Sequence, residues 1–164
     1  MHIDQETLKR MLRDRKLRTK LTKESHKWFF YFYFPHYITC EIAPFHHEMF
    51  ALTEDETIKS LVMVAFRGSA KSTIINMSYP IWAVVGKPQK KFVLILGLTQ
   101  EQARQHLKNI KSELEQNHRL AADMGPFEEP DAEWRSYSLI IPQYGAKIMA
   151  VSIDQSVRGL RHGP

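Results

Sequence analysis

The order of apolar runs and helical stretches after residue 61 constrains the fold of this chain more than any other feature. Residues 61–66 (LVMVAF) and 92–98 (FVLILGL) are short, continuous apolar runs, which are typical of strands buried on both faces of a sheet. A helical pattern follows each run, over residues 71–86 and 99–117. This β-α-β-α order predicts an α/β fold with a mainly parallel central sheet flanked by helices.

The residues before this alternation predict a helical N-terminal segment. A helix rich in aromatic residues is expected to begin near Thr22 or Ser25, because both are good N-cap residues, and to end before Pro35. A shorter helix is expected to begin at Pro44, since proline is favoured in the first turn.

Two further strands are expected near the end of the chain. Residues 136–142 (SYSLIIP) and 146–153 (AKIMAVSI) are apolar and β-branched, and only QYG separates them. A link this short predicts an antiparallel hairpin rather than a strand entered from a crossover helix.

Composition limits the class of protein. The chain has 164 residues, of which 43% are hydrophobic and 25% charged, as in ordinary globular proteins. Its single cysteine, Cys40, rules out an internal disulfide and fits a reducing compartment. The longest aromatic run, residues 28–34, is too short to span a bilayer, and the first residues lack the apolar core of a signal peptide. We therefore expect a cytoplasmic protein without a membrane segment.

The net charge of the chain is concentrated at one end. Residues 1–27 hold nine Lys/Arg against four Asp/Glu, so the whole net charge of +5 lies there. Such a basic segment can contact a polyanion such as DNA, and its alternative role is that of a solvated helix face. The candidate DNA or partner contacts are Arg10, Arg13, Arg15, Lys16 and Arg18.

The loop after the first apolar run resembles an altered phosphate-binding loop. The standard pattern is G-x-x-x-x-G-K-[ST], and here Ala65 and Ala70 replace the two glycines while Lys71 and Ser72 keep their places. In α/β sheets, ligands bind where strands lead into helices, which is where this loop lies. Gly68 remains available for the sharpest bend, and an alanine in a left-handed conformation costs only about 1 kcal/mol.

The chemistry expected of this loop is ATP and Mg²⁺ binding. Lys71 would reach the β and γ phosphates, and the Ser72 hydroxyl would ligate Mg²⁺. Arg67 would stabilise charge in the transition state, so that Arg67 and Lys71 are the catalytic candidates. The alternative is a plain strand–turn–helix with a surface lysine. The candidate ATP-binding residues are Arg67, Gly68, Ser69, Ala70, Lys71, Ser72 and Thr73.

Four stretches, taken together and in order, resemble the large terminase subunit of tailed bacteriophages. They are FHHEMF, VMVAFRGSAKST, FVLILGLTQEQARQHLKNIKSEL and QSVRGLR, within residues 44–161. The resemblance implies a P-loop NTPase fold and an ATPase that drives double-stranded DNA into a procapsid. It also implies a nuclease, a homo-oligomeric motor, and a portal protein and a small terminase subunit as partners.

The resemblance also sets the expected domain organisation. Residues 1–42 would form the basic helical segment, and residues 43–164 would form the N-terminal part of the ATPase domain. In the family pattern a strand that ends in two acids, the Walker B pair, follows RGLR, whereas this sequence ends at Pro164. We therefore expect a chain truncated before the Walker B acids, with the nuclease domain absent.

Asp154 and two adjacent histidines are the other candidate metal ligands in the sequence. Asp154 follows an apolar strand and is the alternative Mg²⁺ acid, but Gln155 stands where the second acid would be needed. His46 and His47 are adjacent and point apart on a helix, which favours core or surface roles over metal binding.

Two other functions remain open from the sequence. One is a different P-loop ATPase of the helicase or nucleoside-kinase type. The other is a non-catalytic remnant that binds DNA or a partner through residues 9–27. Nucleotide binding separates the remnant from both enzymes.

Overall fold

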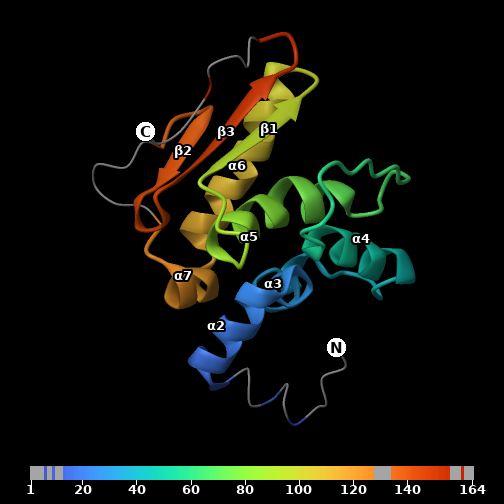
Figure 1. The fold of residues 1–164 in the computed structure, drawn as a ribbon, viewed down its shortest axis with the longest axis vertical. Helices are drawn as coiled ribbons and strands as arrows, with labels where there is room; N and C mark the ends of the chain where they lie inside the picture. Colours follow the sequence, from blue (N-terminus) through green and yellow to red (C-terminus); the bar gives the residue numbers. More distant parts are fainter. Residues whose placement is uncertain (1–5, 7–8, 10–12, 128–133, 156–159, 161–164) are drawn as a thin grey trace.

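A computed structural model gives the fold (Figure 1). It describes the whole chain except residues 1–5, 7–8, 10–12, 128–133, 156–159 and 161–164. Along the chain the elements are α2 (Arg15–Glu24), α3 (His26–Tyr33), η1 (Pro35–Tyr37), α4 (Pro44–Glu54), η2 (Ser72–Ser78), α5 (Tyr79–Val85), β1 (Phe92–Gly97), α6 (Gln100–Gln116), α7 (His118–Met124), β2 (Ser138–Ile141), η3 (Pro142–Tyr144) and β3 (Ala146–Ser152).

Local capping explains where several helices begin. The Ser25 hydroxyl accepts the N–H of Trp28 and starts α3, which ends before Pro35 as predicted. The Thr99 hydroxyl accepts the N–H of Gln102 at the start of α6. Pro44 opens α4, also as predicted.

The sheet has three strands in the order β1-β3-β2. β1 runs parallel to β3, with Phe92 opposite Lys147 and Gly97 opposite Ser152. β2 and β3 form the predicted antiparallel hairpin. Helix α6 packs along β1 and β3, while α2, α3 and α4 lie at the other end of the molecule (Figure 1).

The predicted fold class is wrong. A P-loop NTPase core needs a mainly parallel central sheet, and the described residues contain one small mixed sheet with a single parallel pair. Residues 61–66 form no strand, and the side chains of Val62 and Val64 are 84% and 93% exposed. The physical reason is that an apolar run is buried in a sheet only where neighbouring strands pair with its backbone. No described strand does so here.

One part of the core is rich in aromatic side chains. Phe29, Phe34 and Trp82 are buried where α3 meets α4 and α5. The Trp82 indole N–H donates to the carbonyl oxygen of Thr22 at 3.1 Å, which joins α5 to α2. Helices α2 and α3 therefore share one core with α4 and α5. Within the described part of the chain, no helix has the length and apolar character needed to cross a membrane.

Candidate functional site

The loop before η2 contains two tight bends in its backbone. Gly68 has φ of +86° and Ala70 has φ of +56°, so both residues are left-handed. The turn costs Gly68 little, whereas Ala70 bears a strain of about 1 kcal/mol. Ala65 is not left-handed. Of the two positions where alanine replaces glycine, only Ala70 therefore carries a conformational cost.

The side chain of Lys71 closes the loop. Its Nζ atom donates to the carbonyl oxygen of Ala65 at 3.1 Å, and the residue is half-buried. An ammonium group has three donors, so this contact leaves donors for an anion. The sequence predicted that Lys71 lies in a loop that leads into a helix. It did not predict that the side chain would fold back across the turn.

Backbone donors gather at the same place. Within the described residues, the N–H groups of Gly68, Ala70, Lys71 and Ser72 donate to no protein acceptor. η2 and α5 form one continuous helix over residues 72–85, and its first turn begins here. The exposed N–H groups of a helix start and of a left-handed turn both favour an anion.

His46 supports the loop from α4. The N–H of Ala43 donates to His46 Nδ1 at 3.1 Å, so Nδ1 is the acceptor and Nε2 carries the proton. Nε2 then donates to the carbonyl oxygen of Ser69 at 3.1 Å. The sequence pattern did not predict this role, because it joins two residues 23 positions apart and depends on how α4 packs. The only local signal was a histidine three residues after the N-cap of a helix opened by Pro44.

The remaining loop side chains provide polar and charged groups. Arg67 and Ser72 are exposed, and Thr73 is half-buried. The Ser69 hydroxyl is buried and, among the described residues, has no hydrogen-bond partner. Residues 65–73 line a concavity of about 500 Å³. All seven predicted ATP-binding residues therefore lie around one concave surface.

The residues at this concavity suit a Mg²⁺–phosphate ligand. Mg²⁺ takes few protein ligands and is bound largely through water and phosphate oxygens, so one hydroxyl such as that of Ser72 fits it. Within the described residues, no group of three or more His, Cys, Asp or Glu side chains could hold a metal ion by itself.

Asp154 lies on another element. It is exposed in the turn after β3, where the N–H of Gln155 donates to the carbonyl oxygen of Ser152. In the described part of the chain, no hydrogen bond or ion pair connects Asp154 to Lys71 or Ser72. The structure therefore does not bring the alternative Mg²⁺ acid into contact with the loop.

The basic candidates of the N-terminal segment fall into three groups. Arg10 lies outside the described residues. Arg13, Arg15 and Lys16 are exposed, although Arg15 also approaches Asp123 of α7. The remaining candidate, Arg18, is half-buried.

Arg18 is bound inside the fold. Its Nε and Nη2 atoms donate to the two carboxylate oxygens of Asp123 at 2.6 and 2.7 Å. The Tyr33 hydroxyl donates to the same carboxylate at 3.0 Å. Hydrogen bonding to Asp123 raises the pKa of Arg18. This arrangement anchors α2 to α7 and gives Arg18 a structural role.

Comparisons with protein-family models, with curated proteins and with solved structures find no match for this chain. The assignment of a function therefore depends on the chemistry of the loop.

Proposed function

We propose that residues 65–73 bind the phosphates of ATP together with Mg²⁺, as the ATPase part of a viral DNA-packaging motor. The observation that carries the proposal is the clustering of donors: the Lys71 ammonium and the backbone N–H groups of Gly68, Ala70 and Ser72 surround one concavity. The nucleotide-binding part of this proposal rests on the loop alone, because the described sheet is not that of a P-loop NTPase.

Each side chain has a distinct role in this proposal. The Lys71 ammonium neutralises charge on the β and γ phosphates, and the Ser72 hydroxyl holds Mg²⁺. Arg67 is exposed and lines the concavity, and its guanidinium would bind outer phosphate oxygens. Bound Mg²⁺ would neutralise phosphate charge during hydrolysis.

The motor function rests on the ordered resemblance to large terminase subunits. In this proposal the DNA is double-stranded, the motor is a homo-oligomer, and a portal protein and a small terminase subunit are its partners. Arg13 and Lys16 are exposed, so their charges are available to DNA phosphates, and the exposed Arg15 would exchange its contact with Asp123 for such a phosphate.

The decisive experiment is calorimetric titration of Lys71→Ala with Mg²⁺–ATP. We expect binding to be lost while the thermal unfolding temperature stays within a few degrees, because the side chain contacts loop backbone and fills no core position. Lys20→Ala is the matched control, since Lys20 is an exposed lysine on α2. Equal ATP affinity in all three proteins would show that the loop is a structural turn.

A further inference from the structure

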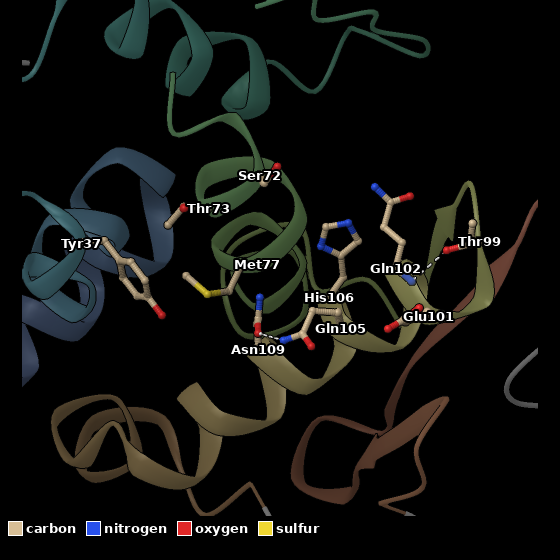
Figure 2. A pocket seen from close by; sticks show the side chains of 10 residues that line it. All are labelled: Tyr37, Ser72, Thr73, Met77, Thr99, Glu101, Gln102, Gln105, His106 and Asn109. Atoms are coloured by element: carbon tan, nitrogen blue, oxygen red, sulfur yellow. Dashed lines mark hydrogen bonds between the residues drawn. The ribbon is translucent and has the colours of Figure 1, made fainter. Parts of the chain in front are cut away.

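A second cavity lies beside the phosphate loop. It has a volume of about 420 Å³ and lies between the first turns of η2 and the N-terminal half of α6 (Figure 2). Ser72 and Thr73 line both this cavity and the loop concavity. A ligand with phosphates on the loop can therefore place its remaining part here.

Paired amides give this cavity a fixed set of donors and acceptors. Gln105 Nε2 donates to Asn109 Oδ1 at 2.8 Å, which leaves the Gln105 carbonyl as an acceptor and the Asn109 amide hydrogens as donors (Figure 2). Gln102 Oε1 accepts the N–H of Leu98 at 2.9 Å, so its amide hydrogens remain available.

His106 adds a neutral donor. Asn76 Nδ2 donates to His106 Nε2 at 3.3 Å, so the ring proton lies on Nδ1. Burial lowers the pKa of His106, which keeps the ring uncharged at neutral pH. Among the described residues that line the cavity, Glu101 brings the only charged group, and none is a lysine or an arginine. The cavity is therefore unsuited to a second phosphate.

We propose that this cavity binds the nucleoside of the nucleotide whose phosphates occupy the loop, an inference that rests on the proposed function. Nucleobase edges and ribose hydroxyls present mixed donors and acceptors, which neutral amides match. A carboxylate such as that of Glu101 is a common partner of ribose hydroxyls. Met77 and the ring of Tyr37 add apolar surface, and the volume falls within the usual range of ligand pockets.

The test separates the two parts of the nucleotide. Mg²⁺–ATP and inorganic tripolyphosphate with Mg²⁺ are each titrated into the wild-type chain and into the double variant Gln105→Ala/Asn109→Ala. Both residues are exposed, so the variant should fold. Gln116→Ala is the control, because Gln116 is exposed on the same helix and does not line the cavity.

We expect the double variant to keep wild-type affinity for tripolyphosphate and to bind ATP about tenfold more weakly, as for the loss of two hydrogen bonds. Unchanged ATP affinity in the double variant would overturn the inference. An equal loss for both probes would also overturn it, since the two amides would then act on the loop. If the wild-type chain binds neither probe, the proposed function itself fails.

Discussion

Two apolar runs in this chain differ in whether the fold buries them. Residues 28–34 (WFFYFYF) form most of α3 and contribute Phe29 and Phe34 to the core. Residues 61–66 (LVMVAF) are equally apolar, yet they form no element and expose most of their side chains. A helix satisfies its own backbone hydrogen bonds, so α3 needs only apolar neighbours to be buried. An extended run also needs a paired strand, and the described residues supply none for 61–66.

A Phe→Ala substitution in each run should give the largest difference in the free energy of unfolding. Phe34 is fully buried and packs on Phe29 and Phe30, so Phe34→Ala should lower the free energy of unfolding by ~3–5 kcal/mol. Phe66 is 66% exposed and contacts Phe45, so Phe66→Ala should cost about 1 kcal/mol or less. Urea denaturation of both variants measures the difference, and equal costs would show that the exposed run is buried in solution.

The aromatic region should also respond to pH. His26 is fully buried against Trp82, and burial lowers its pKa to about 3 from the ordinary value of 6.5. Its neutral ring is satisfied: Nδ1 lies 2.7 Å from the Thr53 hydroxyl and Nε2 lies 2.9 Å from the Ser78 hydroxyl. Below pH 6.5, His26 binds a proton in the unfolded state but stays neutral in the folded state. The contribution of neutral His26 to the free energy of unfolding is therefore fully present above pH 6.5. It falls as the pH is lowered towards 3.

The size of this effect follows from proton linkage. Between pH 7 and pH 5, His26 alone should lower the free energy of unfolding by about 2 kcal/mol. Urea denaturation at both values measures the loss, and His26→Gln is the control because it removes this titration. A loss of the same size in wild type and His26→Gln would assign the pH dependence to other groups.

The features that the sequence predicted are those controlled by neighbouring residues. The start of α3 at Ser25, strand β1, helix α6 and the β2–β3 hairpin follow local capping, periodicity and loop length. The bend at Gly68 was likewise expected from the absence of a side chain. Local signals of this kind are present in the sequence whatever the rest of the chain does.

The features that the sequence failed to predict depend on distant residues. The Arg18–Asp123 ion pair joins positions 105 residues apart, and nothing near Arg18 in the sequence indicates its partner. Residues 61–66 were expected in a sheet because an apolar run shows that burial is favourable, but it does not show which strand will pair with it. The wrong fold class came from this missing information.

The loop of residues 65–73, which begins at the end of the exposed run, allows a finer test by backbone strain. Ala70→Gly should raise the free energy of unfolding by ~0.5 kcal/mol or less, because glycine relieves the left-handed strain but offsets at least part of this gain by its greater freedom in the unfolded chain. Ala65→Gly is the matched control and should lower stability by a similar amount, since Ala65 has no such strain to relieve. Thermal unfolding of both variants decides it, and equal shifts of the same sign would exclude strain at Ala70.

The smallest effect is expected within the exposed run itself. Val64 is 93% exposed, so Val64→Ala removes two methyl groups that already contact water and should change the free energy of unfolding by less than ~0.5 kcal/mol. Val84 in α5 is 2% exposed, and Val84→Ala should cost about 2 kcal/mol because the same two groups leave the core. Both residues have the same side chain, so the ratio of the two costs measures burial alone.

Urea denaturation at two protein concentrations gives this ratio. The cost of Val64→Ala could approach that of Val84→Ala and grow with protein concentration. That result would show that residues 61–66 are buried by association between molecules. A large cost that does not depend on protein concentration would show that residues 61–66 are buried within a single chain. That result would contradict the difference in burial between this run and α3.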